Sequence, residues 1–262
     1  MGVKVNCELV KKEVVAEGIY KFTVKAPAIA EKAKAGQFLE IKVSKTGAPF
    51  LRRPISIYNI CKEEGLVEFI FQVKGEGTKL LAEENIGAEL DIMGPLGNGS
   101  FDIGDYKKVA IIGGGIGTYP LHELAKELNE KSDVTVYMGF RNKDLVTLED
   151  EFAKVSNRLV ITTDDGSYKE KGFAINFLKE DCETQKPDCI YSCGPIPMLR
   201  AVKQFAEENN IPCQVSLEEK MGCGIGVCVG CAVKTAKSPK EAPEYYGVCK
   251  QGPVFDAKEV EF

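Results

Sequence analysis

The 262-residue chain contains no tryptophan and only one histidine, His122. A Ser-His-Asp triad and a multi-histidine metal site both depend on histidine, so the sequence all but excludes these two kinds of centre. The chain also lacks a block of lysine or arginine, and its formal net charge is −5. Nucleic acids and anionic membrane surfaces are therefore poor candidates for partners.

Long apolar runs are absent as well. No stretch approaches the roughly 20 residues that cross a bilayer as a helix, and residues 1–7 lack the apolar core of a secretory signal. We therefore expect a cytoplasmic protein without a membrane span. The chain does have ten cysteines, and in a reducing compartment these indicate metal or redox chemistry rather than disulfides.

Four of the cysteines form a C-x4-C-x2-C-x17-C pattern. The first three have the spacing of plant-type [2Fe–2S] sites, in which a tight loop wraps the cluster and a distant thiolate closes it. Glycines fill the gaps, and glycine most easily adopts the positive φ angles that such a loop needs. Structural zinc usually takes two C-x2-C pairs, of which there is one here, and ordinary buried thiols need no such spacing. The predicted metal ligands are Cys223, Cys228, Cys231 and Cys249.

Short apolar segments separated by glycine, proline and lysine dominate the first hundred residues. This pattern predicts a small antiparallel β-barrel, which we assign to residues 1–101. The expected elements are strands at 18–24, 38–43 and 66–73, a helical stretch at 79–84 and a turn at 94–98 that could end the domain.

Two motifs in this region suit phosphate. Arg53 stands beside Pro54 and Ser56 in an extended segment, and an arginine can hold a phosphate through two parallel hydrogen bonds. The turn that contains Gly77 and Thr78 leads into a helix, whose first amides are free to bind an anion. Taken singly, each motif is also compatible with a solvated edge strand or a plain turn. Together they predict a clamp for the pyrophosphate of a dinucleotide.

Strands and helices alternate over residues 102–216, which predicts a doubly wound parallel sheet. Ligands of such sheets bind at the carboxyl ends of the strands. The loop 113–117 follows the first strand and is rich in glycine, although it is not a strict G-x-G-x-x-G. The absence of G-K-S/T argues against an ATP-binding P-loop. Arg141, after the second strand, does not by itself decide between NAD and NADP.

In this order, R-x-P-x-S, G-x-G-T, a glycine-rich loop and C-G-P-x-P-M resemble the ferredoxin–NADP reductase superfamily. The resemblance implies that the barrel binds FAD and that the sheet binds a pyridine nucleotide. It assigns no catalytic residue beyond Cys193, which it places near the nicotinamide and flavin rings. For FAD it implies a flavin motif of Arg53, Pro54, Ile55 and Ser56, a neighbouring strand with Ile70, Phe71 and Gln72, and a phosphate-binding turn of Gly77 and Thr78. For the pyridine nucleotide it implies a loop of Gly113, Gly114, Gly115, Ile116 and Gly117, and a turn near the rings formed by Cys193, Gly194 and Pro195.

The segment 217–262, with its four cysteines and its Gly-Pro-Val-Phe tail, most closely resembles the electron-transfer subunits of NAD-dependent (class 1B) dihydroorotate dehydrogenase. That resemblance implies FAD, a [2Fe–2S] cluster and NAD as cofactors. It implies a heterotetramer of two plus two subunits with an FMN-containing catalytic partner, acting in pyrimidine biosynthesis. One departure is Tyr119, where smaller residues are more usual.

Two alternatives remain open from the sequence. The chain could be the flavin subunit of an NADH–ferredoxin:NADP oxidoreductase, a sulfide dehydrogenase or a hydrogenase, although bifurcating relatives can replace one cluster cysteine with aspartate. It could instead be a zinc-stabilised binding module, which would leave the flavin and nucleotide motifs as coincidence.

Overall fold

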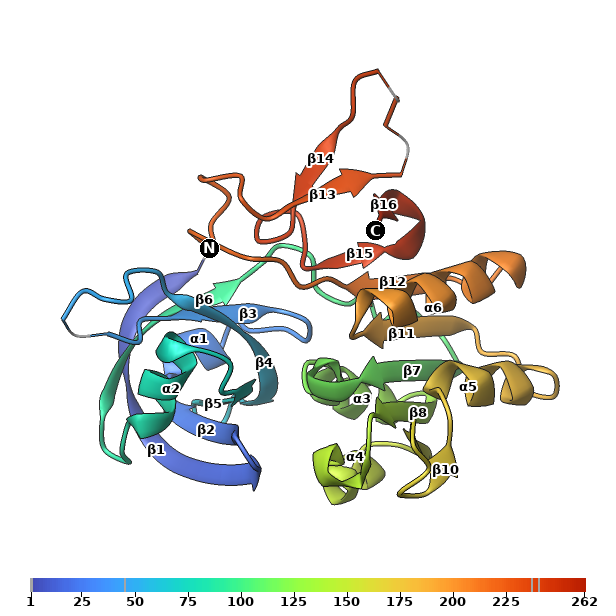
Figure 1. Cartoon of the computed structure of the whole chain (residues 1–262), viewed down its shortest axis with the longest axis horizontal. Coiled ribbons are helices and arrows are strands. Elements are labelled where there is room, and N and C mark those ends of the chain that lie inside the picture. Colours follow the sequence, from blue (N-terminus) through green and yellow to red (C-terminus); the bar gives the residue numbers. More distant parts are fainter. Residues whose placement is uncertain (1, 45, 237, 240) are drawn as a thin grey trace.

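The computed structural model describes residues 2–44, 46–236, 238–239 and 241–262. It places a barrel beside a layered α/β unit, and the C-terminal segment lies across both (Figure 1). The expected fold class is therefore confirmed: an antiparallel barrel, a parallel-sheet nucleotide domain and a small C-terminal module.

The barrel closes in the strand order β1-β2-β5-β4-β3-β6. Its interior is formed by alternate residues of each strand, such as Val67, Phe69 and Phe71. The Phe22 and Phe71 rings meet edge to face with their centroids 5.1 Å apart. The strands are β1 (Val3–Ala16), β2 (Ile19–Lys25), β3 (Phe38–Ile41), β4 (Arg53–Cys61), β5 (Leu66–Gln72) and β6 (Glu89–Leu96), and the helices are α1 (Pro27–Ala30) and α2 (Glu76–Glu83).

Strand β1 closes the barrel because it changes partner along its length. It pairs with β6 over Val3–Glu8 and with β2 over Glu8–Ala16. The expected turn at 94–98 is wrong in its first half, since Gly94 and Leu96 belong to β6 and pair with Val3 and Phe38. The ladder to β3 is irregular at this place, and a proline is tolerated in a strand at such a bulge.

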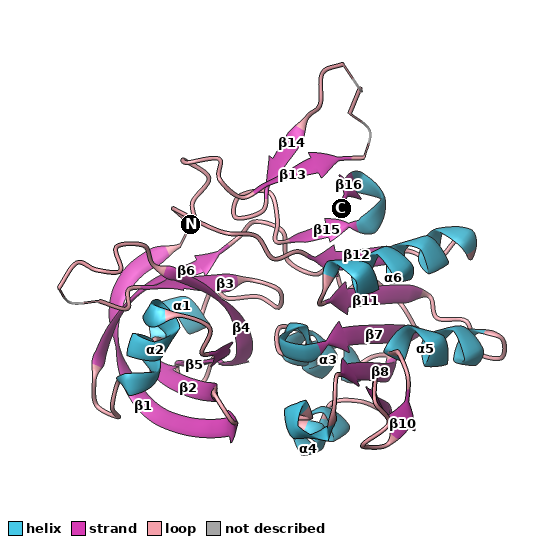
Figure 2. Cartoon of the chain, viewed as in Figure 1, coloured by secondary structure: helices cyan, strands magenta, loops and turns pink. Residues whose placement is uncertain are grey.

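The α/β unit is a sheet in the order β10-β9-β8-β7-β11-β12-β15, parallel except for its last strand. Helices cover both faces (Figure 2), as the alternating pattern predicts. Apolar residues of α3 and α4 pack on one face, and those of α5 and α6 pack on the other. The elements are β7 (Lys108–Gly114), η1 (Gly115–Thr118), α3 (Leu121–Asn129), β8 (Asp133–Phe140), η2 (Lys143–Leu145), α4 (Glu149–Lys154), β9 (Arg158–Thr163), β10 (Glu170–Lys171), α5 (Ala174–Cys182), β11 (Cys189–Cys193), α6 (Ile196–Glu208) and β12 (Cys213–Ser216).

The C-terminal segment is tied to both larger units. Its β15 (Val254–Asp256) extends the α/β sheet by pairing with β12. Phe38 and Leu96 of the barrel share an apolar core with Cys231 and Cys249 of the segment. The other elements of the segment are β13 (Ala232–Thr235), β14 (Tyr245–Gly247), η3 (Ala257–Glu259) and β16 (Val260–Glu261). In the described part of the chain, no helix is both long and apolar enough to span a membrane.

Candidate functional site

The two phosphate motifs of the barrel come together in space. The Arg53 guanidinium lies directly over Gly77 in the first turn of α2, so closely that a Cβ on Gly77 would lie 2.6 Å from Arg53 Nη2. Only glycine allows this approach. A guanidinium next to the free amides of a helix start forms a site for a phosphate group.

The start of α2 is organised by Thr78. Its Oγ1 accepts hydrogen bonds from the backbone N–H groups of Lys74, at 2.9 Å, and Gly75, at 3.2 Å. On β4, the run Arg53–Ser56 is half-buried and pairs with β3. Arg53 thus lies at the open end of the helix with Gly77 and Thr78, and Pro54, Ile55 and Ser56 follow it along β4.

The three predicted residues of β5 do not share one face. Phe71 belongs to the barrel interior, whereas Ile70 packs in the core that joins the barrel to the α/β unit. Gln72 is half-buried at the end of the strand. The alternation of a β-strand makes this division unavoidable for adjacent residues.

The glycine loop and the Cys-Gly-Pro turn meet at the carboxyl ends of β7 and β11. These strands are parallel neighbours, and Cys193 pairs with Gly113. Beyond the strands, Gly117 approaches the Gly194 backbone so closely that a Cβ would lie 2.5 Å from the Gly194 Cα. Pro195 packs against Gly114 in the same way, at 2.8 Å from such a Cβ. The loop 113–117 and the turn 193–195 therefore form one surface at the edge where open sheets bind ligands.

Cys193 is 1% exposed, and burial raises the pKa of its thiol far above the usual value. The thiol therefore stays protonated and is a packing or hydrogen-bonding group rather than a nucleophile. Glu218, just beyond β12, interacts electrostatically with Cys193, and desolvation raises the pKa of Glu218 while Lys74 opposes that change. Glu218 is not among the residues predicted from the sequence, although it lies two residues after β12, the parallel neighbour of β11, and so had to lie near the same edge.

Tyr119 and His122 lie behind the glycine loop and face the interior. Tyr119 is buried, and its hydroxyl is 3.2 Å from Thr147 Oγ1, so it does not line the nucleotide edge. The His122 ring stacks on Tyr58 with centroids 4.4 Å apart. Burial, reinforced by Lys126, lowers the pKa of His122 to about 4. The imidazole is therefore neutral at pH 7 and acts in packing.

Backbone amides donate to the sulfurs of three predicted metal ligands, Cys223, Cys231 and Cys249. Gly226 N–H donates to Cys249 Sγ at 3.1 Å, and Val227 N–H donates to Cys223 Sγ at 3.3 Å. Burial alone would raise the pKa of the Cys223 thiol, but the amide donors lower it to about 6. The amides therefore favour the thiolate form at Cys223, which is the form that binds a metal, whereas burial and the neighbouring Cys231 raise the pKa of Cys249.

The cysteines are arranged as two pairs. The side chains of Cys223 and Cys228 interact, as do those of Cys231 and Cys249. Among the residues that the structure describes, no three histidine, cysteine or acidic side chains converge as a site for a single metal ion. A binuclear iron–sulfur cluster takes two protein ligands on each iron, so two pairs fit it better than a mononuclear zinc site.

Glu40 connects the cysteine loop to the barrel. It is 1% exposed, and neither carboxylate oxygen has a hydrogen-bond partner within the described ranges. Its side chain lies against Gly224, where an added Cβ would be 2.6 Å from Glu40 Oε1. Burial raises the pKa of Glu40 to about 7, although Arg52 opposes this shift. A buried carboxyl without a partner is unusual, and it stands between the Arg53–Ser56 strand and the cysteine loop.

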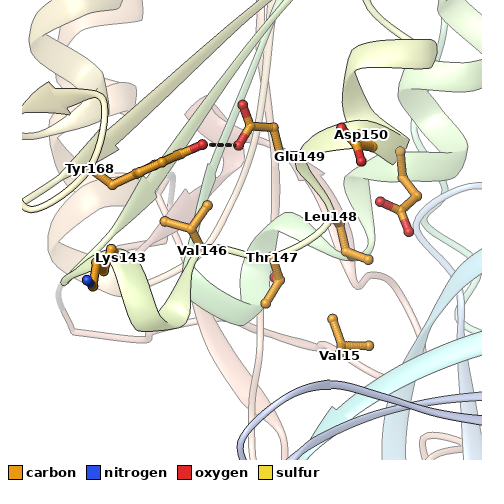
Figure 3. A pocket seen from close by; sticks show the side chains of 9 residues that line it. Val15, Lys143, Val146, Thr147, Leu148, Glu149, Asp150 and Tyr168 are labelled. Carbon is orange, nitrogen blue, oxygen red and sulfur yellow. Dashed lines mark hydrogen bonds between the residues drawn. The ribbon is translucent and has the colours of Figure 1, made fainter.

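A separate cavity of about 340 Å³ lies beyond β8 (Figure 3). Its carboxylates come from the start of α4, and the Tyr168 hydroxyl donates to Glu149 at 2.7 Å. None of the residues that the sequence predicted to bind a cofactor lines it. The cavity is lined by Val15, Lys143, Val146, Thr147, Leu148, Glu149, Asp150, Glu151 and Tyr168.

The fold and these sites define a class of protein. A barrel with an arginine beside a helix start, an open sheet with a glycine-rich edge and a loop of four cysteines are the parts of a flavin- and nucleotide-dependent oxidoreductase with an iron–sulfur centre. Family models match all three parts: an oxidoreductase FAD-binding domain at residues 6–101, an oxidoreductase NAD-binding domain at 111–204 and the iron–sulfur cluster binding domain of dihydroorotate dehydrogenase B at 218–261.

Curated relatives identify the family more narrowly. The chain is 40% identical over 261 residues to the electron transfer subunit of dihydroorotate dehydrogenase B (NAD(+)) of Bacillus pumilus, with 98% of each chain covered. It is 40% identical to the Fusobacterium nucleatum subunit of the same name, also with 98% of each covered. The chain belongs to the family of dihydroorotate dehydrogenase B (NAD(+)) electron transfer subunits.

Solved structures share the fold of this chain. A structure of NADH-dependent reduced ferredoxin-NADP oxidoreductase, concerned with flavin-based electron bifurcation, is 30% identical and superposes with a TM-score of 0.86, covering 100% of this chain and 91% of the other. The ferredoxin reductase of carbazole 1,9a-dioxygenase shares the fold, with a TM-score of 0.68, 22% identity and coverage of 80% and 67%. FAD, NAD and an iron–sulfur cluster are thus the cofactors of the chain.

Proposed function

We propose that this chain passes electrons from the oxidation of dihydroorotate to NAD+ in pyrimidine biosynthesis, through a [2Fe–2S] cluster and FAD. The observation that carries the proposal is the two-pair cysteine loop packed against the flavin-motif side of the barrel at Gly224 and Glu40. When bound, FAD exchanges electrons both singly and in pairs, and so links a cluster to a nicotinamide.

Each unit of the chain then has one task. Residues 1–101 hold the flavin, with Arg53 and the start of α2 at its pyrophosphate, Ser56 on the same strand, and Ile70, Phe71 and Gln72 on the strand beside it. Residues 102–216 hold NAD on the loop 113–117, with Cys193, Gly194 and Pro195 at the rings. The buried thiol of Cys193 helps to exclude water there. Residues 217–262 hold the cluster through Cys223, Cys228, Cys231 and Cys249.

The partner is an FMN-containing catalytic subunit that oxidises dihydroorotate, in a complex of two plus two subunits. The relatives' name, which designates an electron transfer subunit, implies a catalytic partner subunit. The cluster loop supports this proposal, since Ile225, Val227 and Val229 are apolar and exposed. Exposed apolar side chains around a redox centre suit a docking surface. We place the complex in the cytoplasm, where reduced thiols are stable.

Spectroscopy tests the cofactors. Anaerobically purified protein is expected to show overlapping flavin and iron–sulfur absorbance and an EPR signal on reduction. Cys228→Ser should lose iron while it keeps most of its flavin, because the flavin motifs lie in another unit. A colourless, zinc-containing protein, or normal iron content in Cys228→Ser, would contradict the assignment.

Co-purification tests the partner and the reaction. The chain together with the catalytic subunit should reduce NAD+ when dihydroorotate is supplied. Loaded protein that binds no such subunit, but exchanges electrons between NADH, NADP+ and ferredoxin, would favour the reaction named for the structural neighbour.

A further inference from the structure

Strand β4 has an open edge in the middle of the molecule. It pairs with β3 only from Arg53 to Ser56, and the last bond on that side joins Ile57 N–H to Gln37 O. On its other side β4 pairs with β5 as far as Cys61. Beyond Ile57, therefore, the backbone groups that point away from β5 have no strand to bind. An uncovered edge of this kind needs other partners.

Two side chains of α3 supply them. Glu123 Oε2 accepts a hydrogen bond from Ile60 N–H at 2.8 Å, and Lys126 Nζ donates to Ile60 O at 3.1 Å. Lys126 also reaches Asn59 Oδ1 at 3.0 Å and Glu123 Oε2 at 3.2 Å. The Glu123 carboxylate thus replaces the C=O, and the Lys126 ammonium replaces the N–H, that a neighbouring strand would offer to Ile60. We call Glu123 and Lys126 the edge clamp.

The clamp is buried on one side and borders a cavity on the other. The Glu123 residue is 5% exposed, and next to it His122 stacks on the buried Tyr58. On the other side, a cavity of about 850 Å³ extends between the barrel and α3. The two units are therefore not in contact across that cavity, and the clamp is the polar connection at its rim.

The two elements that the clamp joins also carry the two cofactor motifs. The flavin motif forms the first four residues of β4, and Ile60 lies four residues after its last member, Ser56. The glycine loop runs through η1 directly into α3, and Glu123 lies six residues after Gly117. Both paths are short, so a movement at the clamp changes the distance between the motifs.

We propose that Glu123 is a positioning residue for hydride transfer, because it fixes the flavin strand relative to the nucleotide loop. The inference rests on the proposed roles of Arg53–Ser56 and of the loop 113–117. Hydride transfer needs the reacting atoms about 3–3.5 Å apart, and a misplacement of about 1 Å can lower the rate about 100-fold. Glu123 belongs to neither motif and acts through the backbone of Ile60.

The experiment compares Glu123→Ala with Glu123→Gln. Glutamine keeps an oxygen that can accept from Ile60 N–H, whereas alanine leaves that amide without a partner. Glu261→Ala serves as a matched control, since it removes a carboxylate from an exposed ion pair with Lys234 far from the clamp. All proteins are purified with their flavin and cluster, and flavin and iron per chain are measured first.

The readout is anaerobic stopped-flow reduction of the flavin by NADH, with the rate at saturation separated from the dissociation constant. Glu123→Ala should reduce its flavin about 10–100-fold more slowly at saturating NADH, and the long-wavelength absorbance of the nicotinamide–flavin pair should weaken. The dissociation constant of NADH should stay within about twofold of wild type, because the binding residues are intact. Glu123→Gln should recover most of the rate, and Glu261→Ala should match wild type.

A wild-type rate in fully loaded Glu123→Ala overturns the inference, as does an equal loss in Glu123→Gln. If Glu123→Ala does not fold, Lys126→Met provides the test, because it removes the donor to Ile60 O and leaves Glu123. A slower rate at saturation supports the clamp, and an unchanged rate refutes it. The proposed function fails separately, if loaded wild-type protein is not reduced by NADH at all.

Discussion

At the scale of single residues, the cysteine loop depends on a glycine as much as on its thiolates. Gly224 has φ +67°, and the Glu40 side chain fills the space where a Cβ would lie. Both the backbone angle and the contact therefore exclude a larger residue. The loop can follow its path between the cysteines only while this position is glycine.

Gly224→Ala should lower the iron content to less than about half of wild type, because strain at one such residue costs about 1–3 kcal/mol. Flavin content should be unchanged, and iron, sulfide and flavin per chain measure both. Gly230→Ala is the control, because that glycine has no positive φ and a Cβ would only contact Cys228 Sγ at 3.6 Å. Equal iron in the two variants would contradict the role of Gly224.

His122 predicts a pH dependence of stability. Its pKa is lowered from 6.5 to about 4 in the folded chain, so the unfolded chain binds the proton first as the pH falls. The contribution of this group is complete above pH 6.5 and is lost between pH 6.5 and 4. Between pH 7 and pH 5 the loss should be about 2 kcal/mol.

Urea unfolding of wild type and His122→Phe at several pH values measures this effect. Phenylalanine keeps a ring against Tyr58 but cannot take up a proton. The free energy of unfolding should therefore fall less steeply toward pH 5 in the variant. Parallel curves for the two proteins would show that the imidazole is not the titrating group.

At the scale of elements, β4 joins functions that the sequence shows separately. Its first residues form the flavin motif, and its last residues receive the edge clamp from α3. Helix α2 is equally specialised, since its first turn receives the Arg53 guanidinium. These elements are short, and their positions come from their neighbours rather than from their own propensity.

Arg53→Ala should weaken FAD binding about 10–100-fold, because a charge-assisted hydrogen bond to phosphate contributes about 1.5–3 kcal/mol. Flavin fluorescence released on dilution measures the dissociation constant. Arg158→Ala removes an arginine from β9, where it pairs with Asp181, and should bind FAD like wild type. Unchanged affinity in Arg53→Ala would exclude the phosphate clamp.

At the scale of the whole molecule, the C-terminal module is the part positioned to meet a partner. It packs on the barrel through the core around Phe38 and on the sheet through β15, yet its loop remains open (Figure 1). Val227 on that loop is 75% exposed. An electron transfer subunit needs its redox centre at the surface that binds the catalytic subunit.

Val227→Glu should therefore weaken the complex with the catalytic subunit by at least about tenfold, since a charge at an interface centre is costly. Flavin and iron content should not change. Val14→Glu is the matched control, because Val14 is 68% exposed near the far end of β1. Co-purification and titration calorimetry measure binding. Equal weakening in both variants, or none in either, would place the interface elsewhere.

The sequence alone predicted the cluster ligands, and it determined the motifs and the kinds of unit. Cysteine spacing, the phosphate motifs and the alternation of strands and helices are local patterns. Such patterns can be recognised in a sequence because glycine, proline and cysteine have restricted structural and chemical roles. The length of β1 and the continuation of β6 through Pro95 could not be predicted from the sequence, because both depend on which strands lie alongside.

The tertiary structure decided what the motifs contact. Glu40 and Glu123 are ordinary glutamates in the sequence, and only folding places them against Gly224 and Ile60. It also turned Tyr119 away from the nucleotide edge. Contacts between residues far apart in the chain arise from the packing of whole elements, and no local pattern records them.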